Sequence, residues 1–535
     1  MSGGLRPRRA LARGAARRGV RRAGAGSSPR AARREPRRAA PPARSLGAAL
    51  FALLAAGGCG APEQGAGGVS GCRLPALAAA PGRSVVLVVN DTMRWDFPAP
   101  YGGPARTPAL DELASQGLVF EDARAPSPWT KPSVATLFTG LPPRRHGMLT
   151  HPGRQRRAGQ PLGRPLRSSD VLGAGIPTLA GVLRDAGYRT GAFVANPWLD
   201  RRFGFARGFE HYDDALARWG VAGSRVVDAA LAWVASLPPD RPFLLYVHTL
   251  DSHRPHPPVP WREIAARPEL LEAPAGSLPP RAWQELRRAV RVEGAPPGAR
   301  PRITPAVLRV AYRLGVERFD RNLARLLRGL AEDPRGPGAL VLVTSDHGEA
   351  LFERGYGNHG NALFDEEIRI PLLLRMPGLP AARVPCPVGL EDVFPTLCAA
   401  LGLRCPSGLP GRSLLGPDLP GERVRVAEGV SGRPRNRAAA GRRFKLHRLP
   451  DGGPGAPRRS PPERFHDLVS DPAERIDLLA GGGRGLDPEV RLALDRLREV
   501  LDRAARDEPV RAPGQVPLDP ELERRLRELG YLGEG

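Results

Sequence analysis

The chain contains little lysine and few aromatic residues. Lys131 and Lys445 are its only lysines, so arginine supplies nearly all of the positive charge behind a formal net charge of +25. Residues 1–44 alone hold fourteen arginines and one glutamate, which is +13 of that charge, and no long basic run follows them. Aromatic residues make up 5%, whereas nucleic-acid-binding proteins combine a basic stripe with aromatic side chains that stack on bases. The composition therefore predicts no nucleic-acid partner.

Cysteine and long apolar runs are scarce as well. The five cysteines show no zinc-finger spacing, and Cys398 and Cys405 are close enough in the sequence to form a disulfide in an oxidising compartment. Beyond the N-terminal region, no run is long and apolar enough for a transmembrane helix. Hydrophobic residues still make up 41% of the 535 residues. This length and composition predict a globular protein of one large domain with appendages, or of two to three ordinary domains.

The N-terminus has the pattern of an export signal. An arginine-rich stretch is followed by the short apolar segment 46–56 and then by Gly57-Gly58-Cys59. This pattern resembles a bacterial lipoprotein signal, in which Cys59 carries a lipid. We therefore expect residues 1–59 to direct export to the periplasm or cell envelope, with membrane contact only through a lipid anchor at Cys59. A disordered Ala/Arg tail is the alternative interpretation.

From residue 84 onward, apolar runs alternate with helical segments. The runs are rich in Val and Leu, as in strands buried on both faces of a parallel sheet, and comprise residues 84–90, 191–195, 242–248, 339–344 and 370–374. Helical periodicity between and after them covers residues 107–115, 177–186, 222–236, 304–331 and 391–402. Thr107 and Pro108 are typical of a helix start, with threonine as the N-cap. The alternation predicts an α/β fold whose central, mostly parallel sheet has helices on both faces.

Composition also divides the chain into parts. The division predicts an export segment (1–59), a Gly/Ala/Pro-rich linker (60–82), a main domain (83–422), a small C-terminal subdomain of short strands and turns (423–480) and a charged helical tail (481–535).

Polar side chains directly follow three of the predicted strands. Asp91 follows the first run, residues 248–253 with two histidines follow the third, and Asp346 and His347 follow the fourth. In open α/β sheets, ligands bind beyond the carboxyl ends of the strands. Aspartate and histidine are ligands for divalent cations. One aspartate after a strand is typical of a turn, but three such strand ends predict a metal site.

A fourth element, residues 128–140, contributes a hydroxyl. Pro132 fits the first turn of a helix, which places Thr130 beside the helix N-terminus. The unpaired N–H groups and the dipole there favour an oxyanion. A hydroxyl next to a cation that lowers its pKa can act as a nucleophile. A plain helix-capping role for Thr130 fits the sequence equally well.

Residues 84–480 resemble the sulfatases and related members of the alkaline-phosphatase superfamily. The resemblance rests on the order and spacing of short segments, among them Val-Val-Asn-Asp-Thr-Met-Arg-Trp-Asp (88–96), Pro-Ser-Val-Ala-Thr-Leu-Phe-Thr-Gly (132–140), Tyr-Val-His-Thr-Leu-Asp-Ser-His-Arg-Pro (246–255), Thr-Ser-Asp-His-Gly-Glu (344–349), Asn-His-Gly (358–360) and Phe-His-Asp-Leu-Val-Ser-Asp-Pro-Ala-Glu (465–474). It implies a sulfatase-like fold and a divalent cation (calcium, manganese or zinc) bound by Asp91, Asp346 and His347. It also implies catalytic roles for Thr130, His253 and His359, and supporting roles for His248, His256, Arg94 and Glu349.

Several positions depart from the family pattern. Classical sulfatases use a Cys or Ser that is oxidised to formylglycine, and Thr130, which cannot be converted, stands at that position. Val134 replaces the motif's arginine, and Asn90 replaces an aspartate. Residues 195–198 read Ala-Asn-Pro-Trp where the family has Lys-Trp-His. Lys131 either restores some of the missing positive charge or is a solvated surface lysine.

The resemblance leaves three functional hypotheses. The first is a metal-dependent hydrolase of sulfate or phosphate esters, whose substrate is an anionic ester of a small molecule, glycan or lipid. The second is an extracytoplasmic phosphodiesterase or phosphoryl-group transferase, because a threonine nucleophile resembles those branches of the superfamily. The third is a non-catalytic protein on a degenerate sulfatase scaffold. Loss of the formylglycine cysteine motivates it, and the intact Asp91, Asp346, His347 and His253 oppose it.

Overall fold

The computed structural model describes most of the chain after the predicted linker. The described residues are 77–149, 168–217, 221–271, 280–296, 303–360, 362–416, 422–429, 436–449 and 463–528, with single positions 74, 278 and 419. The predicted export segment (1–59), with Cys59, and most of the predicted linker (60–82) lie outside the described residues.

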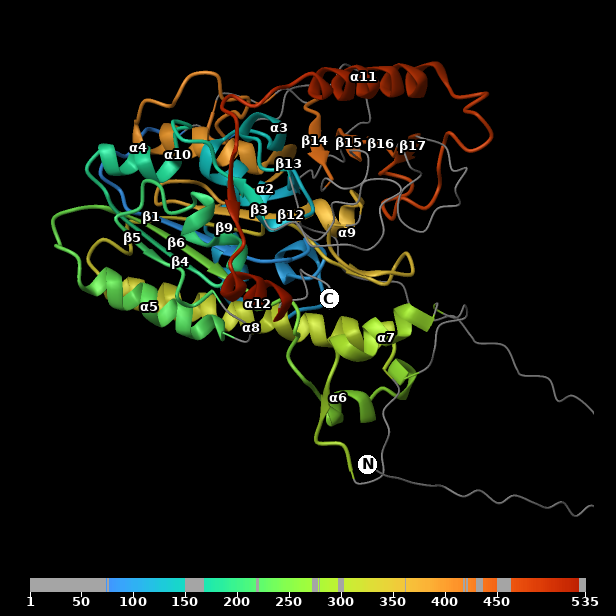
Figure 1. The fold of residues 1–535 in the computed structure, drawn as a ribbon, viewed down its shortest axis with the longest axis horizontal. Coiled ribbons are helices and arrows are strands. Elements are labelled where there is room, and N and C mark those ends of the chain that lie inside the picture. The colour runs from blue at the N-terminus through green and yellow to red at the C-terminus, as the bar shows by residue number, and fades with distance from the viewer. Residues whose placement is uncertain are drawn as a thin grey trace, which may run out of the picture. The chain divides into compact units, whose positions relative to one another are not determined.

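An eight-stranded mixed sheet forms the centre of the fold (Figure 1). Its strands lie in the order β13-β2-β12-β9-β1-β6-β4-β5, and all neighbours are parallel except where β12 meets β9 and β2. Their bounds are β1 Val85–Asn90, β2 Leu118–Arg124, β4 Arg189–Val194, β5 His211–Asp213, β6 Phe243–Thr249, β9 Leu340–Thr344, β12 Arg369–Arg375 and β13 Ala382–Gly389. The predicted α/β fold with a mostly parallel sheet is confirmed.

Helices cover both faces of the sheet, as predicted (Figure 1). Alternate side chains of β1 enter two separate cores: Val85, Leu87 and Val89 face one core, and Val86 and Val88 face the other. The first core includes α2 Thr130–Thr139, α4 Leu179–Asp185 and α10 Val393–Leu401. The second includes α1 Pro108–Ser115, α5 Gly223–Ala235 and α8 Pro305–Ala331. Because both faces of the strand are buried, its sequence is apolar from Val85 to Val89.

Two strands on one side of the sheet, β2 and β13, are not continuous apolar runs, and the sequence did not predict them. β2 contains Glu121 and Asp122, and β13 contains Pro385 and Pro387. Proline cannot donate to a ladder of hydrogen bonds, so it is confined mainly to edge strands, and β13 is an edge strand. β2 is buried, but its second half is polar because Asp122 pairs with Arg124, so a search for apolar runs does not detect it.

Thr107 occupies the N-cap position of α1 and Pro108 begins the helix, as predicted, but a different side chain caps it. The Thr107 side chain makes no capping hydrogen bond, and its Oγ1 accepts one from the Ala99 N–H instead. The carboxylate of Asp320, in α8, accepts hydrogen bonds from the Ala109 and Leu110 N–H groups at 3.1 and 3.0 Å. A residue more than 200 positions away therefore caps this helix.

A second, antiparallel sheet follows the main sheet in sequence, which confirms the predicted small C-terminal subdomain. It has the order β14-β15-β16-β17, with β14 Arg425–Glu428, β15 Arg437–Ala440, β16 Phe444–Arg448 and β17 Glu463–Asp467. Helix α11 (Pro488–Ala505) covers one of its faces (Figure 1). Farther along the chain, β18 (Gly514–Pro517) pairs with β3 (Ser168–Val171), and α12 spans Pro520–Glu528.

The expected disulfide between Cys398 and Cys405 is wrong. Cys398 lies on the buried side of α10 and Cys405 lies in the loop that follows, and both are free thiols. Burial raises the pKa of both thiols. Cys386, in β13, is disulfide-bonded.

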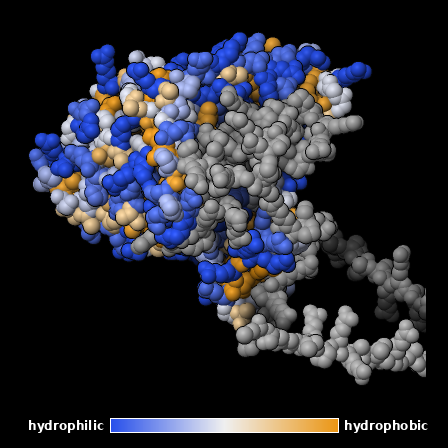
Figure 2. All heavy atoms as spheres, in the orientation of Figure 1, coloured by the Kyte–Doolittle hydropathy of each residue, from blue (hydrophilic) through white to orange (hydrophobic). Residues whose placement is uncertain are grey.

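Within the part of the chain that the structure describes, no helix combines the length and the apolar character needed to cross a bilayer. Hydrophilic side chains cover most of the coloured face in Figure 2.

Candidate active site

The strand order brings polar side chains from separate chain segments to one edge of the main sheet. β9, β1, β6 and β4 are parallel neighbours, so their carboxyl ends meet at the same edge. Asp91 directly follows β1, His248 lies near the end of β6, and Asp346 and His347 follow β9. All four side chains are buried.

These four side chains offer a donor set for a divalent cation. Asp91, His248 and Asp346 each present one ligand atom within 4.8 Å of the others. His347 Nε2 lies 3.7 Å from Asp91 Oδ1 and 3.6 Å from Asp346 Oδ2. Among the described residues, neither of these two carboxylate oxygens has a hydrogen-bond partner. Unpartnered lone pairs on buried carboxylates and imidazoles repel one another. A divalent cation between these groups would accept the lone pairs.

The pKa shifts of the Asp91 and Asp346 carboxyl groups also favour a bound cation. Burial and the nearby Asp346 raise the pKa of Asp91 well above its ordinary value. Burial acts in the same direction on Asp346, but His347 and His248 outweigh it and hold the pKa of that carboxyl below its ordinary value. Two buried carboxyl groups this close cannot both ionise without nearby positive charge. A divalent cation supplies such charge.

Thr130 lies at the N-terminus of α2, as predicted, with Pro132 in the first turn. Its Oγ1 is 3.4 Å from Asp91 Oδ2 and 3.3 Å from His347 Nε2. His347 Nδ1 lies 2.9 Å from the Gly348 carbonyl. Because a carbonyl can only accept, Nδ1 carries the hydrogen, and the Nε2 lone pair faces the Thr130 hydroxyl. The hydroxyl therefore touches both a carboxylate and an imidazole of the donor set.

Asn196 joins this group from the segment just after β4. Its Nδ2 donates to Asp91 Oδ2 at 2.6 Å and lies 3.2 Å from Thr130 Oγ1. Its Oδ1 accepts from the Trp198 N–H at 2.9 Å, which fixes the orientation of the amide. The Asn196 amide thus contacts both the Asp91 carboxylate and the Thr130 hydroxyl, and it fixes their positions relative to each other.

The backbone at Thr92, beside the site, has an unusual conformation. Its φ of 62° lies in the left-handed region, which a β-branched residue rarely adopts. In this conformation the Thr92 N–H lies 3.2 Å from Asp346 Oδ1. Strain of this kind concentrates at functional sites.

Two further histidines adjoin the cluster. The His359 ring lies 4.5 Å from the His347 ring and 5.3 Å from the His253 ring, measured between centroids. Glu349 Oε2 lies 3.1 Å from His359 Nδ1. Burial and the neighbouring His359 lower the pKa of His253 to about 3, so its imidazole is neutral. The structure therefore brings the six predicted site residues into one connected group: Asp91, Thr130, His253, Asp346, His347 and His359.

The model of the family described as Sulfatase matches residues 83–403. The chain belongs to the sulfatase family. This span includes the residues that form the buried cluster.

Individual sulfatases and a related hydrolase also resemble the chain, at low sequence identity. The Δ4,5-hexuronate-2-O-sulfatase of Bacteroides thetaiotaomicron is 23% identical over 431 residues, which is 74% of this chain and 82% of that protein. A structure solved with its substrate D-glucosamine-2-N,6-O-disulfate has a TM-score of 0.59 at 18% identity and covers 79% of this chain and 97% of its own. The phosphonate monoester hydrolase of Agrobacterium radiobacter has a TM-score of 0.58 at 20% identity and covers 79% and 95%. The two structures share the fold.

Two residues of this sulfatase-family site have contacts that the sequence analysis did not assign. His248 was given a supporting role, yet it lies 3.8 Å from Asp91 Oδ2 and 3.7 Å from Asp346 Oδ2. Asn196 was noted only as a departure from the family pattern. Both residues lie at or just after the end of a predicted strand, which is the signal that identified the aspartates.

Other polar residues near the motifs face elsewhere. Asp251 pairs with Arg318 and accepts from Asn322, both in α8. Lys131 is only 1% exposed, so the solvated-surface interpretation is wrong. Its Nζ donates to Ser169 Oγ and to the Asp170 carbonyl, which ties α2 to β3.

Proposed function

We propose that this chain is a divalent-metal-dependent hydrolase of sulfate or phosphate esters, with Thr130 as the nucleophile. Membership of the sulfatase family supports ester hydrolysis in general. The observation that carries the finer proposal is the position of Thr130 Oγ1, within 3.4 Å of Asp91 and 3.3 Å of His347. A nucleophile must lie beside both an acceptor for its proton and a source of positive charge.

Asp91, Asp346 and His347 would hold the cation, with His248 as a further donor. Imidazole ligands favour zinc or manganese over calcium, which prefers oxygen. When bound, the cation lowers the pKa of the hydroxyl and attracts the oxygens of the anionic ester. Asn196 orients the hydroxyl and the Asp91 carboxylate toward each other.

His359 is the candidate for proton transfer to the leaving alcohol, and the neutral His253 would contact the anionic group or the leaving oxygen. His359 is oriented by Glu349, and His253 by the Arg254 carbonyl at 2.6 Å. Thr130 Oγ1 would pass its proton to Asp91 Oδ2 and attack the phosphorus or sulfur atom. The ester bond would break, and the alcohol would leave with a proton from the protonated form of His359. Water would then cleave the bond to Thr130 and release the inorganic acid.

The substrate class follows from the threonine and from the relatives. A hydroxyl that cannot become formylglycine favours phosphoryl substrates, and a phosphonate monoester hydrolase shares the fold. Two of the sulfatase relatives are named for hexuronate and N-acetylgalactosamine substrates, which favours an ester carried by a sugar. We also propose export through residues 1–59 with a lipid at Cys59, and the domain boundaries at 83–422, 423–480 and 481–535. A Cys59→Ala variant that stays with the membrane fraction would count against the anchor.

The test is a paired assay of the metal-stripped chain reconstituted with zinc, manganese or calcium. Aryl sulfate, aryl phosphonate and bis-aryl phosphate are compared as substrates. Thr130→Ala should lose at least two orders of magnitude in kcat, as is typical when a nucleophile is removed, and Thr130→Ser should keep most of it. Thr139→Ala is the matched control, because Thr139 lies in the same helix and bonds only the helix backbone and the following turn.

Each outcome decides between the hypotheses. Metal-dependent turnover that Thr130→Ala retains would contradict the threonine nucleophile. Turnover only when a second alcohol is supplied as acceptor would favour the transferase. Absence of both turnover and metal binding would favour the degenerate scaffold.

A further inference from the structure

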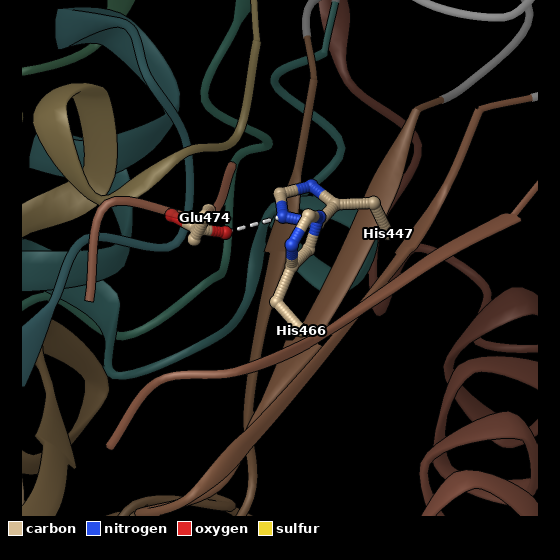
Figure 3. A group of neighbouring side chains, drawn as sticks. All are labelled: His447, His466 and Glu474. Atoms are coloured by element: carbon tan, nitrogen blue, oxygen red, sulfur yellow. Dashed lines mark hydrogen bonds and ion pairs between the residues drawn. The ribbon is translucent and has the colours of Figure 1, made fainter. Parts of the chain in front are cut away.

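A second group of potential metal ligands lies in the small sheet. His447, in β16, and His466, in β17, are on antiparallel neighbours, where Lys445 pairs with His466 and His447 with Arg464. Cross-strand partners share a face, so both histidines lie on one face of the sheet. Figure 3 shows their rings side by side with the carboxylate of Glu474 directed toward them.

The two faces of this sheet differ in character. Phe444, Leu446 and Phe465 belong to the apolar core that includes α11. The opposite face carries Lys445 and the two histidines, and it meets the main domain through Asp365 and Phe364. The histidines are therefore buried between the small sheet and the main domain, away from the solvent-exposed surface.

The three side chains have the burial and the donor geometry of a metal site. His447 is 0% exposed, and His466 and Glu474 are each 2% exposed. Each presents one ligand atom within 4.8 Å of the other two. His466 Nδ1 lies 2.8 Å from the Ile476 carbonyl, so Nδ1 carries the hydrogen and Nε2 keeps its lone pair. A histidine ligand is commonly oriented by such a bond to a backbone carbonyl.

Hydrogen bonds do not occupy all of the ring nitrogens of the two histidines. In the described part of the chain, neither His466 Nε2 nor His447 Nδ1 has a hydrogen-bond partner. His447 Nε2 is 2.6 Å from Glu474 Oε1, while Lys445 occupies the other oxygen, Oε2, at 3.0 Å. A cation on the Oε1 side would replace the contact with Nε2, and the ring proton would move to Nδ1.

The site can be reached from solvent. A surface cavity of about 740 Å³ is lined by His466 and Glu474, together with Arg354, Arg464 and Asp477. His466 and Glu474 thus border the cavity, through which a cation would have to enter and whose water would complete the coordination.

We propose that His447, His466 and Glu474 bind a second divalent cation, distinct from the one at Asp91 and Asp346. Two imidazoles and one carboxylate suit zinc, or another borderline cation such as nickel. The ligands come from two strands of the small sheet and from the loop after them, so the ion would fix that loop against the sheet. The site is independent of the proposed hydrolysis.

The test is the number of zinc ions bound per full-length chain, measured by elemental analysis after zinc loading and gel filtration. The wild type should bind two. Asp346→Asn and His466→Gln should each bind one, and the double variant none. His211→Gln, which changes an exposed histidine, is the matched control and should bind two.

Zinc binding unchanged by His466→Gln would overturn the proposal. If His466→Gln does not fold, zinc-soaked crystals of the wild type decide the matter by anomalous scattering. A peak among the three side chains supports the site, and a peak at Asp91 and Asp346 alone overturns it. A zinc count of one in Asp346→Asn, without any ester hydrolysis by the wild type, would support this site while the proposed function failed.

Discussion

Asn196 is the residue on which the geometry of the candidate active site most depends. Its amide nitrogen donates 2.6 Å to Asp91 Oδ2 and lies 3.2 Å from Thr130 Oγ1, and its own oxygen is held by the Trp198 N–H. Side chains that orient metal ligands in this way contribute nearly as much to activity as the ligands.

Asn196→Ala should therefore lower kcat by on the order of 10- to 100-fold, with a smaller change in KM. Steady-state kinetics on the metal-loaded protein measures both constants. Asn322→Ala is the control, because it removes an amide that donates to Asp251, outside the site. Equal effects of the two substitutions would show that Asn196 has only a general structural role.

Lys131 gives a prediction for the pH dependence of stability. Burial lowers its pKa from 10.5 to about 7, although Asp170 opposes the shift. Between pH 7 and 10.5 the unfolded chain binds this proton more tightly than the folded chain, so stability rises with pH in that window. We expect the unfolding free energy of the wild type, relative to Lys131→Met, to rise between pH 7 and pH 10. Urea unfolding of both proteins measures it, and a difference that is flat with pH would refute the expectation.

At the scale of elements, helix α1 begins where another helix supplies its cap. The Asp320 carboxylate in α8 accepts from the N–H groups of Ala109 and Leu110, which α1 cannot satisfy internally. The contact also attaches α1 to α8 in the second core.

Asp320→Ala should lower the unfolding free energy by about 1–2 kcal/mol, as the loss of a cap usually does. Asp111→Ala is the comparison, because Asp111 is an exposed acid in the first turn of α1 and should contribute below about 1 kcal/mol. Thermal unfolding ranks the two variants. The capping role fails if Asp320→Ala melts no earlier than Asp111→Ala.

At the scale of the whole molecule, buried ion pairs connect the small sheet to the main domain. Lys445, which is fully buried in β16, contacts Asp365 Oδ1 at 2.6 Å and Glu474 Oε2 at 3.0 Å. Asp365 belongs to α9 (Asp365–Ile368) and also pairs with Arg124 of β2. Burial alone would raise the pKa of Asp365, but Arg124 and Lys445 hold it below its ordinary value.

Removing the lysine would leave two buried carboxylates without their partner. Lys445→Met should therefore cost about 3–5 kcal/mol, whereas Arg443→Met, which breaks a half-exposed pair with Asp467, should cost at most about 1 kcal/mol. Urea unfolding with a chelator present separates this effect from metal binding. Similar costs for the two variants would mean that the buried pair does not hold the sheet in place.

The sequence alone determined the fold class, because strands buried on both faces must be largely apolar, and β1, β6 and β9 are apolar up to their last one or two residues. It also determined which residue types follow those strands, and so the candidate ligands Asp91, Asp346 and His347. Local pattern likewise located Thr130 at a helix start, since Pro132 fits only the first turn.

Only the tertiary structure decided which strand ends are neighbours. The order β9-β1-β6-β4 brings His248 and Asn196 to the same edge as Asp91 and Asp346, and nothing in the spacing along the chain encodes that order. The Asp320 cap and the pairing of His447 with Glu474 are long-range contacts of the same kind. Local sequence specifies backbone preference and burial, whereas contacts between distant segments depend on how the buried faces pack together.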